Sequence, residues 1–335
     1  MTLPPGKIPV DLLKEVIFKN LGVKRDEVAL GPAAGIDGAV INVGSRSLIV
    51  SMDPITGALE RIGWLAVNIN ANDISTFGVE PAFFLSCILL PENANRQIVE
   101  TISVQMDKAA KKLGMAIVGG HCEVTPGLTN PIVVGCALGL TEKGNYVTAG
   151  GAKLGDKLIL TKSAGIEGTA ILATDREEQL KKVLKPAMLQ NAKKFYNNIS
   201  VVKDALTAFK AGEVTAMHDP TEGGVSGGIH EMADASNLGV KILKEKILVH
   251  HETAEICKFF KIDPLQLISS GALLISAKPE FANKIIESLK QQKIYASIIG
   301  EFSKDLHERT ITGKDKKIQA LPRPLSDHLW LALLR

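Results

Sequence analysis

Residues 64–78 read Trp-Leu-Ala-Val-Asn-Ile-Asn-Ala-Asn-Asp-Ile-Ser-Thr-Phe-Gly, and the front half of this stretch predicts a packed helix. Asn68, Asn70, Asn72 and Asp73 then follow within about two turns. Asn and Asp are poor helix-interior residues, because their side chains compete for backbone hydrogen bonds. Each of them alone could be a cap or part of a solvated face. The cluster favours a polar site, in which Asp73 supplies oxygen to a hard cation and the amides bind a polar substrate.

The composition is that of an ordinary globular protein. A chain of 335 residues predicts two domains, since single cores stop growing near roughly 250–300 residues. Hydrophobic residues make up 45% and charged residues 22%, so a sizeable core is possible. The net charge is only +3, and no basic block interleaved with aromatic residues is present. Nucleic acid is therefore not an indicated partner.

Four cysteines, Cys87, Cys122, Cys136 and Cys257, bear on the compartment. None forms a CxxC pair, which argues against a zinc finger, and Cys87 and Cys136 lie in apolar runs where we expect core residues. This usage predicts a reducing, cytoplasmic setting. We expect no signal peptide, since a charged segment followed by an apolar core is missing at the start. We also expect no membrane partner, since no apolar run approaches the roughly 18 residues of a spanning helix.

Strands and helices mix through both halves of the chain, which predicts an α+β fold with two domains, residues 1–147 and 148–335. Helices are predicted over residues 10–20, 64–78, 98–113, 201–210, 229–235 and 281–291. Strands are predicted over residues 39–43, 47–52, 83–90, 116–118, 131–140, 157–161, 215–217, 272–277 and 296–299. Residues 148–153, Thr-Ala-Gly-Gly-Ala-Lys, are typical of a linker between the two halves.

Two further carboxylates lie at element ends, as Asp73 does. Asp37 lies in Gly-Ile-Asp-Gly-Ala, a tight glycine-flanked turn before a strand, and Asp53 precedes Pro54 at a strand end. Each could be a simple turn residue, because Asp is common there. Together Asp37, Asp53 and Asp73 could converge on Mg²⁺, which prefers octahedral oxygen ligands and usually keeps waters and phosphate oxygens.

Residues 119–127, Gly-Gly-His-Cys-Glu-Val-Thr-Pro-Gly, are predicted to form a loop after a short buried strand. The paired glycines Gly119 and Gly120 would let backbone amides approach an anion closely. His121 could be an acid or base, a ligand, or only a hydrogen-bonded loop residue. Cys122 could be a nucleophile, but no local feature indicates a lowered pKa. Glu123 is either a metal ligand or a solvated side chain.

Residues 217–228, Met-His-Asp-Pro-Thr-Glu-Gly-Gly-Val-Ser-Gly-Gly, predict a strand that runs into a turn and a glycine-rich helix start. Amides at a helix N-terminus bind anions, which favours phosphate or substrate contact here. The alternative is tight packing of the helix against the sheet. A Walker A sequence is absent, because Gly6-Lys7 and Gly313-Lys314 lack the following Ser or Thr. ATP, if bound, must be held by another device.

These motifs resemble the superfamily of aminoimidazole ribonucleotide synthetase, selenophosphate synthetase, thiamine-monophosphate kinase and the hydrogenase-maturation protein HypE. The resemblance covers nearly the whole chain, and it is specific through the order of the motifs rather than through any one of them. The matching segments are Gly35–Ala39, Ser51–Asp53, Asn72–Ile74 with Gly78 and Pro81 behind it, His218–Gly224 in the form closest to HypE, and Ser269–Leu274.

The resemblance implies two α+β domains, a C-terminal α/β sandwich, and a homodimer in which the N-terminal sheets pack together. It implies Mg-ATP in a cleft formed mainly by the N-terminal domains, and a chemistry in which ATP phosphorylates an oxygen, often of an amide. Carried over, the metal ligands are Asp37, Asp53 and Asp73, and Asp73 and His121 are the catalytic candidates. The residues expected to contact nucleotide, phosphate or substrate are Lys7, Asp37, Asn68, Asn72, Gly119, Gly120, Asp219, Thr221, Gly223 and Gly224.

The chain departs from the family pattern in several places. HypE ends in a cysteine whose thiocarbamate is dehydrated, whereas this chain has no cysteine after Cys257. Glu222 replaces the basic residue usual before the paired glycines of the HypE form. His121 stands where several members carry an acid, and in that respect the loop looks more like that of selenophosphate synthetase. The nucleophilic Cys or selenocysteine near the start of that enzyme is missing, since no Cys precedes Cys87.

The sequence therefore predicts a HypE-like protein that binds Mg-ATP and phosphorylates or dehydrates an unidentified small substrate. One alternative is a nucleotide-binding factor without catalysis that acts with a maturation protein in hydrogenase or metallocentre assembly. Another is a thiamine-monophosphate kinase-like enzyme, which the pattern Asn70-Ala71-Asn72-Asp73 disfavours.

Overall fold

A computed structural model describes residues 6–56 and 59–334 of the chain, and these residues pack into two compact units. Unit 2 consists of residues 25–31 and 37–146. Unit 1 consists of the chain up to Lys24, residues 32–36 and residues 147–335. The N-terminal segment around Lys7 and the short stretch before Asp37 therefore belong with the later part of the chain.

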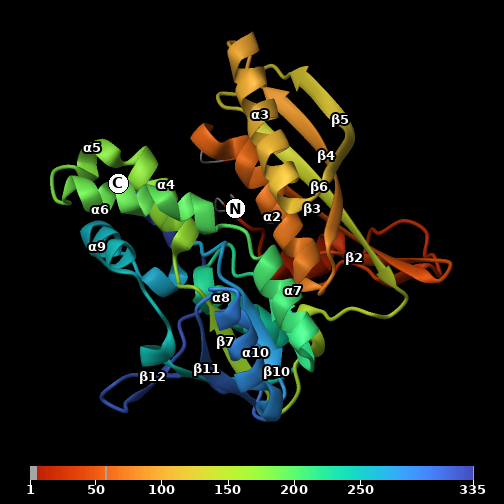
Figure 1. Ribbon diagram of the computed structural model, residues 1–335, viewed down its shortest axis with the longest axis vertical. Coiled ribbons are helices and arrows are strands. Elements are labelled where there is room, and N and C mark those ends of the chain that lie inside the picture. Colours follow the sequence, from red (N-terminus) through yellow and green to blue (C-terminus); the bar gives the residue numbers. More distant parts are fainter. Residues whose placement is uncertain (1–5, 57–58, 335) are drawn as a thin grey trace. The chain divides into compact units, whose positions relative to one another are not determined.

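Unit 2 is built on a six-stranded sheet with the order β1-β2-β3-β6-β4-β5. Its neighbouring strands are antiparallel except for β4 and β5, which are parallel. Two helices lie on one side of the sheet (Figure 1). The strands are β1 Val28–Leu30, β2 Ala39–Val43, β3 Arg46–Ile55, β4 Pro81–Leu90, β5 Ala116–Val124 and β6 Ile132–Glu142, and the helices are α2 Ile62–Thr76 and α3 Arg96–Leu113.

Helix α2 lies between the sheet and α3, which explains its sequence. Every residue of α2 except Trp64 is buried, so its asparagines and Asp73 are buried as well. A Cβ on Gly63 would lie 2.5 Å from the carbonyl oxygen of Ile102, so a glycine at this position lets α3 approach closely. The prediction of a packed helix is confirmed, and the polar residues lie inside it rather than on a solvated face.

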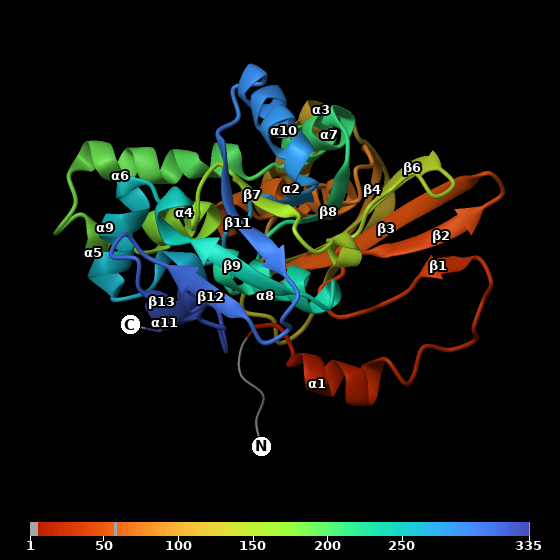
Figure 2. The same ribbon diagram turned by 90° about the horizontal axis from the view of Figure 1, so that it is seen from below.

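Unit 1 contains a seven-stranded sheet with the order β13-β12-β9-β11-β7-β10-β8. One core packs α8 against one face, and a second core packs α7 and α10 against the other (Figure 2). Alternation along β7 places Leu158 and Leu160 in the first core and Ile159 in the second. The elements are β7 Lys157–Thr161, β8 Val214–His218, β9 Gly239–Leu243, β10 Leu274–Ala277, β11 Ala296–Ser303, β12 Arg309–Thr312, β13 Ile318–Ala320, α7 Val202–Ala211, α8 Gly224–Ala235 and α10 Pro279–Gln291.

Five helices of unit 1 were not predicted: α4 and the four helices that it contacts, α5, α6, α9 and α11. The helix predicted over residues 10–20 is present as α1, which continues into a short π-helix. Their bounds are α1 Val10–Leu12, α4 Ile166–Asp175, α5 Glu177–Leu180, α6 Pro186–Lys193, α9 His251–Phe260 and α11 His328–Leu333, with the π-helix at Leu13–Ile17. Short 3-10 turns lie at Leu59–Arg61, Ala149–Gly151, Lys194–Asn198, Lys244–Lys246 and Pro264–Gln266. None of the helices in the described ranges is long and apolar enough to cross a membrane.

The predicted linker at 148–153 follows directly on the boundary between the two units, which lies after Tyr146. It contains a 3-10 turn packed on α8 and β8, where a Cβ on Gly151 would lie 2.1 Å from the carbonyl oxygen of Thr215. The glycine at this position therefore serves close packing.

The prediction that Cys87 and Cys136 are core residues is wrong, since both are only half-buried, although burial does raise the pKa of the Cys136 thiol.

Candidate functional site

An acidic cluster of unit 2 forms where β3 runs beside α2. Ser51 and Asp53 lie two residues apart on β3, so both side chains point to the same face of the sheet. The hydroxyl of Ser51 lies 2.6 Å from Oδ2 of Asp73 and 2.7 Å from the carbonyl oxygen of Asp37. Asp73 is only 4% exposed. Ser51 thus joins the glycine-flanked turn before β2 to the carboxylate of α2, and brings two of the predicted site residues together.

Asn70 holds Asp53, the third predicted carboxylate residue, through hydrogen bonds to the backbone of Asp53. Its Oδ1 accepts a hydrogen bond from the Asp53 amide at 2.8 Å, and its Nδ2 donates to the carbonyls of Asp53 at 3.2 Å and Ala66 at 2.8 Å. A Cβ on Gly135 would lie 2.3 Å from this Nδ2, so glycine on β6 makes room for the amide. Asn70 therefore positions Asp53 and has no amide group left for a substrate.

The other two asparagines of α2 are buried too. Asn68 is 1% exposed and donates from Nδ2 to the carbonyl of Trp64 at 2.8 Å, whereas Asn72 is fully buried. Among the described residues, the carboxylate oxygens of Asp37, Asp53 and Asp73 do not all lie within 4.8 Å of one another. The three residues are thus neighbours of one cluster, but the predicted convergence of all three carboxylates on one point is not seen.

The predicted loop at 119–127 is wrong, because β5 continues through it to Val124. Gly120 pairs with Ser86 of β4, and a Cβ on Gly120 would lie 2.0 Å from the Ser86 carbonyl oxygen. The glycine therefore serves strand pairing. Every residue of β5 is exposed, since it is the edge strand. Gly119 and Gly120 therefore do not form an anion-binding turn. Residues 116–118, which were predicted to be a short buried strand, are the exposed first part of β5.

His121 lies on this exposed edge strand. Its Nε2 is 3.1 Å from Oε2 of Glu123, and the Thr125 hydroxyl donates to Oε1 of Glu123 at 2.8 Å. The hydrogen bonds from Thr125 and then His121 lower the pKa of the Glu123 carboxyl. Glu123 therefore orients His121 through one ring nitrogen, which is an arrangement that an acid or base can use.

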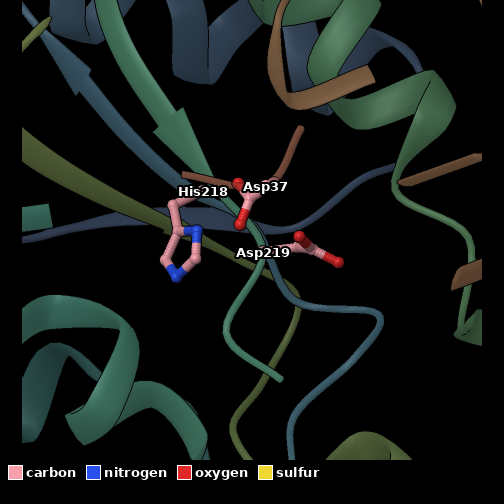
Figure 3. Close-up of side chains that lie close together, drawn as sticks. All are labelled: Asp37, His218 and Asp219. Carbon is pink, nitrogen blue, oxygen red and sulfur yellow. The ribbon is translucent and has the colours of Figure 1, made fainter. Parts of the chain in front are cut away.

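A second cluster lies in unit 1, where β8 ends and α8 begins. Figure 3 shows the side chains of His218 and Asp219 at the end of β8. His218 and Asp219 are each 1% exposed. Gly224 adopts φ +62°, and a Cβ there would lie 2.5 Å from the carbonyl oxygen of Leu267. Tight packing, the alternative considered for the glycine-rich start, thus accounts for Gly224.

The amide of Gly223, the N-cap residue of α8, is already bound to a carboxylate. It donates to Oδ2 of Asp327 at 2.7 Å, and Oδ1 of Asp327 accepts from the Leu329 amide at 2.7 Å. Burial raises the pKa of Asp327 to about 6, although these backbone hydrogen bonds oppose the shift. The helix start does attract an anionic group, and in this chain that group is a side chain of the C-terminal segment.

Lys7 reaches the same end of α8 from the N-terminal segment. Its amide donates to Oε2 of Glu222 at 2.8 Å, and its Nζ lies 3.2 Å from the Thr221 hydroxyl and 3.7 Å from Oε1 of Glu231. The other carboxylate oxygen of Glu231 is 2.8 Å from Nε2 of His218. Burial raises the pKa of Glu231, but the charge of Lys7 and the hydrogen bond from His218 outweigh it and hold that pKa at about 2.

The sequence analysis missed several residues of these clusters. Ser51 was quoted only as a neighbour of Asp53, and Glu222 only as a departure. For Glu231 the available signal was its place on α8, seven residues after Gly224 and so on the same helix face. Nothing in the sequence pairs it with Lys7, because the two are far apart in the chain. Asp327 lies outside every motif.

Comparison with known proteins agrees with the resemblance. The AIR synthase related protein N-terminal domain matches residues 35–141, and the corresponding C-terminal domain matches residues 153–312. The putative hydrogenase expression/formation protein MJ0676 of Methanocaldococcus jannaschii is 28% identical over 313 residues, covering 90% of this chain and 89% of that protein. Carbamoyl dehydratase HypE of Rhizobium leguminosarum bv. viciae is 26% identical over 281 residues, covering 81% of this chain and 78% of that protein.

Solved structures share the fold. The crystal structure of a HypE–HypF complex contains a chain with a TM-score of 0.77 and 24% identity, covering 93% of this chain and 99% of that one. HypE in complex with ATP gives a TM-score of 0.73 at 20% identity, covering 96% of both chains. The expected two-domain α+β fold is therefore confirmed, and with both halves matched in order, the chain belongs to the AIR synthase related protein family.

Proposed function

We propose that this chain binds Mg-ATP and uses it to phosphorylate an oxygen of a small, amide-type substrate. The phosphorylated oxygen can then leave as phosphate, so that the substrate is dehydrated. The observation that carries the proposal is the acidic cluster, in which Ser51 joins the Asp37 turn to the buried carboxylate of Asp73. The proposal is further supported by a relative named as a carbamoyl dehydratase and by a structural neighbour solved with ATP.

The donor set of the acidic cluster fits Mg²⁺. Asp53 lies on the same face of β3 as Ser51, Asp73 lies on α2 beside Ser51, and Asp37 joins them through its carbonyl oxygen. Mg²⁺ takes only one or two carboxylates beside waters and phosphate oxygens. Carboxylates that do not all meet at one point suit Mg²⁺, because this ion keeps several waters among its ligands. When bound, Mg²⁺ would neutralise charge on the transferred phosphoryl group. Ser51 and Asn70 hold the metal-ligand candidates in place before the nucleotide binds. Little conformational entropy is therefore lost when binding occurs.

Other residues of the chain would act on the remaining charges. Lys7 places an ammonium group where α8 begins, beside Thr221, and would contact a phosphate-bearing ligand there. His121, oriented by Glu123, would accept the proton that the substrate nitrogen loses when the phosphorylated oxygen leaves.

The open face of the unit 2 sheet supports a homodimer. This face carries the alternate residues of β3, β4 and β6 that point away from α2, and none of the described helices of unit 2 covers it. It is largely apolar, and Met52 on it is 63% exposed. Its members include Leu48, Val50, Met52, Phe83, Leu85, Cys87, Val134, Cys136, Leu138 and Leu140. A contiguous apolar surface that stays exposed favours association with a second copy.

A second candidate is a nucleotide-binding maturation factor that does not turn over a substrate. It is favoured by the burial of Cys257, which is 2% exposed. Burial raises the pKa of its thiol to about 12, which makes it a poor acceptor of a transferred group. Under this reading the chain would bind a maturation-protein partner, as the HypE of the HypE–HypF complex does.

Calorimetric titration with ATP, with and without Mg²⁺, tests the proposal. We expect the wild type to bind ATP only when Mg²⁺ is present. We expect Asp73→Asn and Asp53→Asn each to weaken the affinity for Mg-ATP by on the order of tenfold or more. Asp107→Asn, which makes the same change in a surface pair with Lys111, is the matched control and should bind as the wild type does. Absence of ATP binding by the wild type would overturn the proposal, and binding without hydrolysis in the presence of candidate amides would favour the second candidate.

A further inference from the structure

The N-terminal segment is held against α8 by two glutamates that the family motif does not account for. Glu222 accepts the backbone amide of Lys7 at 2.8 Å, and Glu231 lies 3.7 Å from the ammonium group of Lys7. The close approach at Gly6 belongs to the same contact, since a Cβ there would lie 2.7 Å from Oε2 of Glu222. A glycine in this place allows the segment to come close enough for both bonds.

Glu231 divides its two oxygens between two partners. Oε1 faces Lys7, whereas Oε2 is 2.8 Å from Nε2 of His218. In a neutral imidazole this contact makes Nε2 the protonated nitrogen, because the carboxylate is only an acceptor. A single side chain thus sets both the place of the Lys7 ammonium group and the tautomer and orientation of His218. Its side chain is 27% exposed, so the interaction is partly shielded from water.

We propose that Glu231 is a positioning residue that fixes Lys7 and His218 together at the start of α8, so that the Lys7 ammonium group is held beside Thr221 as a cation for an anionic ligand. This inference rests on the proposed function for the identity of the ligand, a phosphate-bearing molecule, but not for the contacts themselves. Glu222 supports the same arrangement, because its carboxylate accepts a hydrogen bond from the backbone amide of Lys7.

The two roles of Glu231 can be separated by substitution. Glu231→Gln keeps an oxygen that accepts from His218 but removes the charge that attracts Lys7, whereas Glu231→Ala removes both. Lys7→Met removes the ammonium group and keeps most of the side-chain stem. Glu213→Gln is the control, because Glu213 forms an ion pair of 2.7 Å with Lys278 beyond the opposite end of β8.

The first measurement is hydrogen exchange of residues 6–20 in the protein without nucleotide. We expect Glu231→Gln and Lys7→Met each to speed exchange in this segment, Lys7→Met at least as much because it also removes the contact with Thr221, and the double variant to match Lys7→Met. Glu213→Gln should leave the segment unchanged. ¹⁵N shifts of the His218 ring should report a protonated Nε2 in the wild type and in Glu231→Gln, and lose that signature only in Glu231→Ala.

The second measurement is a double-mutant cycle on the affinity for Mg-ATP and on kcat and KM. We expect each single variant to weaken binding or raise KM by on the order of tenfold, and the double variant to be no worse than either. Independent, additive losses would overturn the positioning role, as would unchanged exchange in the N-terminal segment. If the wild type binds no Mg-ATP, the proposed function fails, while the exchange and ring measurements still decide the role of Glu231.

Discussion

At the scale of single residues, buried polar side chains of α2 act on the backbone of a neighbouring strand. Asn70 satisfies both backbone groups of Asp53 and one carbonyl of its own helix. A buried backbone group that loses its partner costs about 1–3 kcal/mol, so this residue connects stability to the geometry of the acidic cluster. The same logic explains the glycine opposite it at position 135, because a larger residue would occupy the place of the amide.

Replacing Asn70 tests this role. Asn70→Ala should lower the free energy of unfolding by about 1–3 kcal/mol, because the Asp53 amide and carbonyl lose their partner in a buried site. Urea unfolding followed by circular dichroism measures the change. Asn93→Ala, at an exposed position before α3, should stay within about 0.5 kcal/mol of the wild type. Equal stability of the two variants would show that Asn70 does not hold Asp53.

At the scale of elements, the start of α8 is tied to both terminal segments of unit 1. Lys7 contacts Thr221, and the carboxylate of Asp327 accepts from Gly223 while it also caps α11. The start of α8 therefore binds an anionic group, as the glycine-rich sequence predicted, but this group is the carboxylate of Asp327 in the same chain. The energy of this contact therefore depends on the charge state of Asp327.

This dependence predicts an effect of pH. Asp327 has a pKa of about 6 in the folded chain against 3.8 for an ordinary Asp, so the folded state favours the neutral carboxyl. Its contribution to stability is full below about pH 4 and is lost as the pH rises through about 6, with a total of about 3 kcal/mol. Asp327→Asn, which mimics the neutral form, should remove this part of the pH dependence.

Urea unfolding of the wild type and Asp327→Asn at pH 4, 5, 6 and 7 measures it. The difference in unfolding free energy between the two proteins should grow in favour of the variant as the pH rises. Groups shifted the other way, such as Glu231, are present in both proteins and cancel in this difference. A difference that stays constant with pH would contradict the account of Asp327.

At the scale of the whole molecule, the open face of the unit 2 sheet is the feature that a single chain leaves unexplained. Its strands alternate between residues buried under α2 and apolar residues that stay half-exposed. Burial of such a face contributes about 25 cal/mol per Å² of apolar area, which is the reason to expect a second copy on it. The exposed edge strand β5 lies at the border of the same sheet.

A charge on that face should prevent association. We expect Met52→Asp to convert a dimer to monomers in sedimentation velocity at micromolar concentration, because the carboxylate would be buried without a partner. Val104→Asp is the matched control, since Val104 is also apolar and 49% exposed but lies on α3. Dimers of unchanged affinity for Met52→Asp, or a wild type that is monomeric, would rule out this face as the interface.

The sequence by itself determined the fold family, most strands and helices, and the presence of an acidic cluster, because these depend on local periodicity and on motif order. The helix over residues 62–76 was predictable from its front half, where apolar residues dominate, although the helix is buried on all sides and has no polar face. The strand through His121 was not, because an exposed edge strand has no buried face and its glycines are typical of turns. Only the tertiary structure decided that Ser51 joins Asp37 to Asp73, that Asp327 binds Gly223, and that Glu231 holds Lys7. These partners are distant in the chain, and a side chain's local sequence carries no record of which remote group will satisfy its charge.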